Sequence, residues 1–155
     1  MPTGLRIAPL PPTTNSVTSK GNASVEPYLH HVGIIVPSEK RVTALMTLLQ
    51  LEEAYRGYVE RWQALCIFTK ASTGSPIEFV VPQGGVLKEF NSGVGGVHHV
   101  ALAVDSLEKV SQRLQAKGMK LLEEKPIKGA GPFYCNFLSP LYTRGVLIEF
   151  VEEIK

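Results

Sequence analysis

The stretch HHVGIIVPS at residues 30–38 decides the fold, because the chain repeats it 68 residues later as HHVALAVDS at residues 98–106. Two shorter matches follow in the same order: LCIF at 65–68 with YCNF at 134–137, and IEFV at both 77–80 and 148–151. Their offsets are 69 and 71 residues, so only small loop insertions separate the copies. An internal repeat constrains the architecture, and the sequence therefore predicts a duplicated unit.

Each copy of the unit begins with an apolar, β-branched stretch, at about 29–36 and 97–104, whose period-two alternation favours a strand. A helix follows, which Ser38 can cap in the first half and Asp105 or Ser106 in the second. Apolar residues mark one face of each helix: Val42, Leu45, Leu48 and Leu49, then Leu107, Val110 and Leu114. Three more strands are expected in each half, at about 51–57, 63–69 and 76–81, and at about 119–123, 133–138 and 145–151.

This order of elements predicts an α+β fold. Two β-α-β-β-β modules, at about 28–82 and 96–153, would pair into a curved mixed sheet around a cleft. The Pro-, Ser- and Thr-rich residues 1–27 lack apolar periodicity and are expected to form a disordered tail, which leaves a single domain at 28–155.

The amino-acid composition bears on the kinds of binding partner and on the cellular compartment. The 155 residues are 44% hydrophobic and 19% charged, with a formal net charge of +2, which predicts neither a nucleic-acid partner nor a membrane partner. Cys66 and Cys135 match no metal-binding spacing. We expect them to be small core residues in a reducing compartment, and the protein to be cytoplasmic.

A pair of histidines and a glutamate recur on the first and last strands of each half: residues 30–31 with Glu78, and residues 98–99 with Glu149. Any one of them alone would more often be structural. Carboxylates in apolar strands are costly unless they are paired or bind a metal, and the duplication favours a shared metal site. Imidazole and carboxylate together suit Zn, Ni, Co, Mn or Fe(II). Strand parity does not choose between the two histidines of a pair.

Five motifs in the second half carry a family resemblance: GGVHHVA at 95–101, LEKV at 107–110, KGMKLL at 117–122, GAG at 129–131 and GVLIEF at 145–150. With them the chain resembles the vicinal-oxygen-chelate (glyoxalase/bleomycin-resistance) superfamily, and within it the methylmalonyl-CoA epimerases. The resemblance implies His31, His99 and Glu149 as ligands of one divalent metal ion (Co, Ni, Zn, Mn or Mg). Glu78 stands where those epimerases usually have glutamine. A His/Glu/His/Glu ligand set is similar to that of bacterial-type glyoxalase I, which favours nickel or cobalt.

The resemblance also implies an activity, that of a metal-dependent isomerase or epimerase moving a proton α to a carbonyl. Glu149 would be the proton shuttle, alone or alongside Glu78, and Gln63 could orient a substrate oxygen. The implied partners are a small-molecule substrate such as an acyl-CoA, and a second copy of the chain in a homodimer. Two alternatives stay open: a glyoxalase I-type lactoylglutathione lyase, and a metal-free binding protein of the bleomycin-resistance kind. Four ligand candidates argue against the metal-free alternative.

Overall fold

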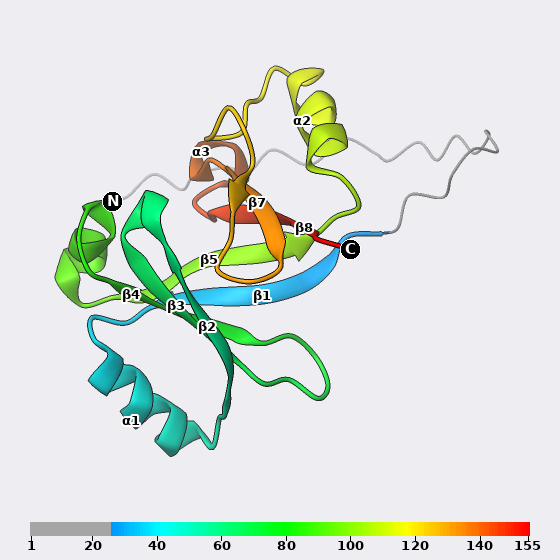
Figure 1. Ribbon diagram of the computed structural model, residues 1–155. Helices are drawn as coiled ribbons and strands as arrows, with labels where there is room; N and C mark the ends of the chain where they lie inside the picture. Colours follow the sequence, from blue (N-terminus) through cyan, green and yellow to red (C-terminus); the bar gives the residue numbers. More distant parts are fainter. Residues whose placement is uncertain (1–25) are drawn as a thin grey trace, which may run out of the picture.

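A computed structural model describes residues 26–155 (Figure 1), so the predicted tail, except for its last two residues, lies outside the described part of the chain. Eight strands form a single sheet in the order β2-β3-β4-β1-β5-β8-β7-β6. The elements in chain order are β1 (Tyr28–Ile35), α1 (Glu39–Leu49), β2 (Glu53–Val59), η1 (Glu60–Trp62), β3 (Ala64–Thr69), β4 (Ile77–Pro82), η2 (Val86–Gly93), β5 (Gly96–Ala103), α2 (Leu107–Gln115), β6 (Ile127–Lys128), β7 (Phe133–Leu138), α3 (Pro140–Thr143) and β8 (Ile148–Glu153).

The two halves of the sheet have the same pairing pattern. β1 pairs in parallel with β4, and the antiparallel pairs β4–β3 and β3–β2 extend the sheet from there. β5 pairs in parallel with β8, followed by the antiparallel pairs β8–β7 and β7–β6. The antiparallel pair β1–β5 joins the halves. The predicted α+β fold with a curved mixed sheet is therefore confirmed.

Hydroxyl caps begin both long helices as predicted. The Ser38 side chain accepts a hydrogen bond from the backbone N–H of Arg41, and Ser106 accepts one from that of Lys109, so Ser106 rather than Asp105 is the second cap. Both helices pack on the outside of the sheet (Figure 1). The expected apolar face of α1 was partly wrong, because Leu48 and Leu49 are 76% and 53% exposed.

One predicted strand, at about 119–123, is absent as a continuous element. Leu121 makes only an isolated bridge with Leu138, and β6 lies further along the chain with two residues. The buried Asn136 side chain accounts for the difference. It accepts a hydrogen bond from the N–H of Glu123 and donates one to the carbonyl of Glu123, which replaces part of a strand ladder.

Close contacts between the two ends of the sheet nearly close it. A Cβ atom at Gly57 on β2 would collide with the backbone carbonyl of Ala130, and one at Gly131 would collide with the ring of Tyr55. The enclosed core draws on both halves, and it contains Cys66 and Cys135 as free, buried thiols, as predicted. Within residues 26–155 no helix is long and apolar enough to cross a membrane.

Candidate metal centre

Strand register brings one histidine and one glutamate from each half to the centre of the sheet. Gly33 on β1 is the partner of both Glu78 on β4 and His99 on β5. In the matching row, Ala101 on β5 is the partner of both His31 on β1 and Glu149 on β8. The middle residue of each row is small, so the imidazole beside it has room to lie over the sheet.

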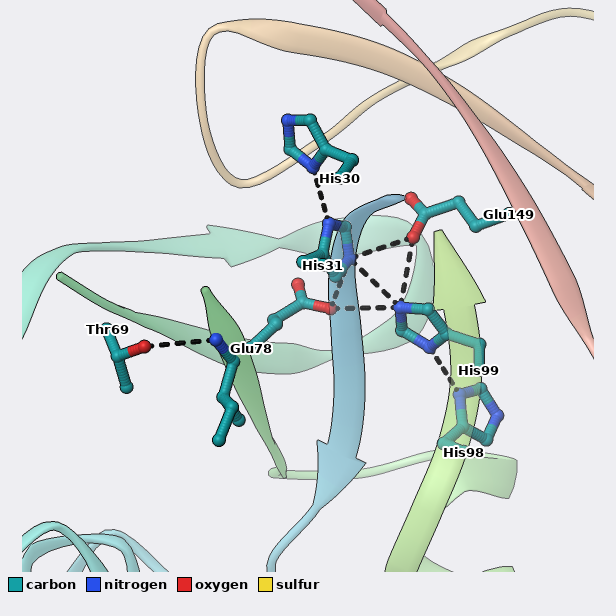
Figure 2. A network of polar contacts seen from close by, with 8 residues as sticks. His30, His31, Thr69, Glu78, His98, His99 and Glu149 are labelled. Carbon is teal, nitrogen blue, oxygen red and sulfur yellow. Dashed lines mark hydrogen bonds and ion pairs between the residues drawn. The ribbon is translucent and has the colours of Figure 1, made fainter. Parts of the chain in front are cut away.

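Four atoms of these side chains meet on the inner face of the sheet (Figure 2). His31 Nε2 lies 3.2 Å from Glu78 Oε2 and 3.0 Å from Glu149 Oε2. His99 Nε2 lies 3.1 Å and 3.0 Å from the same two oxygens, and the two nitrogens are 3.1 Å apart. The four residues are between 0% and 6% exposed, so water does not compensate their polarity.

This cluster fits a divalent cation. Donor atoms bound to one ion at about 2.0–2.2 Å lie about 2.8–3.6 Å apart when they are neighbours, and the N–O and N–N separations here are 3.0–3.2 Å. Glu149 Oε2 is buried and has no hydrogen-bond partner, although both Nε2 atoms lie 3.0 Å away. The four atoms are therefore directed toward a common point, with a donor set of two imidazoles and two carboxylates that transition-metal ions accept.

The electrostatics of the four groups are strongly coupled. Burial disfavours the imidazolium of His31, but the carboxylates of Glu149 and Glu78 outweigh burial and raise its pKa to about 9. The same balance raises the pKa of His99 to about 10. Burial would raise the pKa of Glu149, yet contact with His31 and His99 lowers it to about 2, and the pKa of Glu78 is lowered for the same reason. Without a cation, protons on the imidazoles balance the two carboxylates.

Loading this centre with a divalent cation at pH 7 is expected to release about one to two protons per ion. The pKa values of His31 and His99 lie above 7, so protons must leave before the nitrogens can bind metal. The two Nε2 atoms are only 3.1 Å apart, so a second proton on the pair is held less firmly than the first. Affinity should accordingly rise with pH up to about 9 to 10 and fall toward acid. Calorimetric titration in buffers of different ionisation enthalpy measures the released protons, and zero release would contradict the assignment.

Two further histidines, to which the sequence analysis gave no role, contact the ring nitrogens of His31 and His99 that face away from the cluster. His30 Nδ1 lies 2.6 Å from His31 Nδ1, and His98 Nδ1 lies 2.9 Å from His99 Nδ1 (Figure 2). Burial lowers the pKa of His30, and it lowers the pKa of His98 to about 4. The neutral rings of His30 and His98 can then accept a hydrogen bond at Nδ1 from the Nδ1–H of His31 and His99, which leaves Nε2 of His31 and His99 for the centre. The repeated His-His pair was the available signal.

A cavity of about 200 Å³ opens beside the centre and is lined by Glu78, His99 and Glu149 at its polar end. His98 also lines it. Gln63, which follows the end of η1 and was expected to orient a substrate oxygen, is not among the described residues that line this cavity. Its side chain lies against Gly84.

Replacing Gly33 by alanine is expected to weaken divalent-cation binding at least about tenfold, comparable to the loss of a residue that orients a ligand. The new Cβ would overlap the imidazole of His99, which must move. Gly57→Ala is the matched control, since its Cβ would meet the backbone of Ala130 and none of the four clustered residues. Both changes should lower stability by about 1–3 kcal/mol. Equal affinities in the two variants, measured by competition with a chelating dye, would contradict the role given to Gly33.

Comparison with known proteins gives a consistent result. The sequence profile described as "Glyoxalase/Bleomycin resistance protein/Dioxygenase superfamily" matches residues 30–137. The chain is similar to the mitochondrial methylmalonyl-CoA epimerase of Dictyostelium discoideum, with 34% identity over 59 residues, which cover 38% of this chain and 36% of that enzyme. The match thus spans about a third of the length of that relative.

Solved structures share the fold. A hypothetical protein from Bacillus halodurans C-125 is 28% identical, with a TM-score of 0.74, and the alignment covers 83% of this chain and 96% of that one. A variant of Streptomyces coelicolor methylmalonyl-CoA epimerase in complex with 2-nitronate-propionyl-CoA is 21% identical, also with a TM-score of 0.74, covering 82% and 97%. The likeness to the Streptomyces protein concerns the fold alone.

Proposed function

Because this chain belongs to the glyoxalase/bleomycin resistance protein/dioxygenase superfamily, we propose that it is a metal-dependent isomerase or epimerase. Its substrate would be a small acid or an acyl-CoA, and the reaction would remove and return the proton on the carbon α to a carbonyl. The observation that carries the proposal is the convergence of four buried donor atoms, two nitrogens and two oxygens, at the polar end of a cavity. The similarity to the Dictyostelium epimerase supports this reaction class.

In this proposal His31, Glu78, His99 and Glu149 hold one divalent ion, and the candidate ions are Co, Ni, Zn, Mn and Mg. When bound, such an ion polarises a carbonyl oxygen and makes the hydrogen on the adjacent carbon more acidic. His30 and His98 orient the two imidazoles through Nδ1. The cavity walls are mainly apolar, so a bound substrate would displace water from them and strengthen each of these interactions.

Glu149 is the proposed proton shuttle. Its carboxylate lines the cavity, so it can take the α-proton of a bound molecule and return it. Glu78 lines the same cavity from the other half of the sheet. A carboxylate on each side suits return of the proton to the opposite face, which is epimerisation. Return to the neighbouring carbon would instead be an isomerisation of the glyoxalase type.

Metal analysis followed by isotope exchange tests the proposal. The purified protein should hold close to one divalent ion per chain, or take one up on reconstitution. In deuterated water the loaded protein should exchange the α-hydrogen of methylmalonyl-CoA, or of a longer 2-alkylmalonyl-CoA, as followed by proton NMR. A chelator should stop the exchange. Absence of stoichiometric metal, or metal without exchange on either thioester, would sink the proposal.

A glyoxalase I-type lactoylglutathione lyase is the second candidate, and Glu78 is the observation that favours it, because it completes a His/Glu/His/Glu set. The cavity argues the other way. None of the described residues that line it is lysine or arginine, whereas a glutathione adduct carries two carboxylates. Turnover of the methylglyoxal–glutathione hemithioacetal, with no exchange on the malonyl thioesters, would select the lyase. The homodimer and the cytoplasmic location stay predictions.

A further inference from the structure

The cavity beside the candidate metal centre has a volume of about 200 Å³ and a mainly apolar lining. Glu78, His99 and Glu149 form the polar end of this cavity. A substrate whose oxygen binds an ion held by these residues would therefore place its carbon skeleton in the cavity. The character of the remaining walls therefore reports on the substituent that the substrate carries. This step rests on the proposed function.

The walls are built from both halves of the sheet and are mainly apolar. The wall residues include Trp62, Ala64, Cys66, Leu87, Cys135 and Phe137. Ala64 and Cys135 are 0% exposed, and burial raises the pKa of both thiols, so Cys66 and Cys135 present neutral S–H groups. Such walls stabilise hydrocarbon and offer little to a second polar group.

The charged residues of the cavity lining also favour an uncharged substituent. Among the described lining residues, Glu123 is the one charged side chain outside the polar end, and it forms an ion pair with Arg61 across the two halves, with N–O distances of 3.1 and 3.2 Å. A carboxylate placed among the apolar wall residues would lose hydration without meeting a cation, which is costly. The part of the cavity away from Glu78, His99 and Glu149 therefore suits an uncharged group.

Volume gives the size of that group. An apolar cavity of about 150 Å³ holds one benzene molecule, and this cavity is about 200 Å³. The chelating end of the substrate takes part of this volume, and beside a methyl substituent much of the remainder would stay empty and lose contacts with the walls. We propose that the substrate carries, next to the metal-held carbonyl or carboxylate, an uncharged alkyl or aryl group of about four to six carbon atoms.

A series of 2-substituted malonates tests this assignment on the cobalt-loaded, full-length protein. Methyl-, ethyl-, propyl-, butyl- and phenylmalonate share one chelating end and differ only in the group offered to the cavity. Burial of a methylene contributes about 0.8 kcal/mol, so affinity should rise about fourfold per carbon and about sixtyfold from methyl to butyl. Calorimetry gives the affinities. Trp62, the single tryptophan of the chain, lines the cavity, and its fluorescence reports independently whether the group enters it.

Leu87→Trp should remove the chain-length gain, because Leu87 lines the cavity and a larger ring would fill it. Leu141→Trp is the matched control, since Leu141 is 91% exposed and outside the cavity lining. A flat affinity series, or no malonate binding by protein that holds cobalt, overturns the assignment. Failure of the proposed function has a different signature, namely no metal uptake or no α-hydrogen exchange.

Discussion

Glu149→Gln is expected to lower the affinity for a divalent cation by more than about a hundredfold, beyond the loss typical of an outer-shell partner, and to reduce α-hydrogen exchange to background. The change removes a negative charge from the donor set and places a neutral amide at the position of Glu149 Oε2, which lies 3.0 Å from both imidazoles. It also removes the proposed proton acceptor. Because glutamine has nearly the same shape, the cation-free variant should still fold.

The measurements for this variant are a chelator-competition titration, proton NMR in deuterated water and circular dichroism. Glu108→Gln is the matched control, because Glu108 is exposed on α2 and its carboxylate accepts a hydrogen bond from Gln112, away from the four clustered residues. The control should bind metal and exchange hydrogen at close to the original level. If Glu149→Gln binds metal and turns over as the unchanged protein does, Glu149 is neither ligand nor shuttle.

Metal loading should raise the midpoint of thermal unfolding by about 10–20 °C, the second large effect. An ion present at about a thousand times its dissociation constant stabilises the native state by about 4 kcal/mol, and each kcal/mol moves the midpoint of a domain of this size by about 3–5 °C. The gain arises because the cation satisfies two buried carboxylates and two buried imidazoles that meet at 3.0–3.2 Å.

Differential scanning fluorimetry checks this shift for cobalt, nickel, zinc, manganese and magnesium. Calcium is the control ion, because it prefers six to eight oxygen ligands and should find few here. Addition of a chelator should return the midpoint to that of the cation-free protein. An equal shift with calcium, or the full shift in a His99→Ala variant, would contradict a centre built from imidazole nitrogens.

The repeat in the sequence accounts for most of what could be predicted. Two copies of an apolar strand followed by a capped helix imply the same local structure twice, and the profile match over residues 30–137 confirmed the predicted family. The sequence also placed one histidine and one glutamate of each half on strands that proved to be neighbours in the sheet. The local sequence pattern was enough to place these residues on strands, because the period of a strand is only two residues.

Features that depend on contacts between distant residues escaped prediction. The prediction of a strand near 119–123 was wrong. The side chain of Asn136, more than ten residues away, forms hydrogen bonds with both the N–H and the carbonyl of Glu123. Helical spacing shows which residues of a helix share one face, but not how much of that face the sheet covers. The exposure of Leu48 was therefore not predicted. Gln63 has a left-handed φ of 48°, and its side chain lies against Gly84, neither of which the strand pattern predicted.

The row pattern in which each half supplies one histidine and one glutamate has an evolutionary consequence. A single module would carry half of a metal centre, and two separate copies would have to associate before an ion could be held by four side chains. Fusion into one chain makes that encounter intramolecular, so the second half-site is present at high effective concentration at any dilution. Fusion also allows the sequences of the two halves to change independently of each other. Gly33 and Ala101 already differ at equivalent positions, and the cavity walls are free to diverge while the four ligands stay paired.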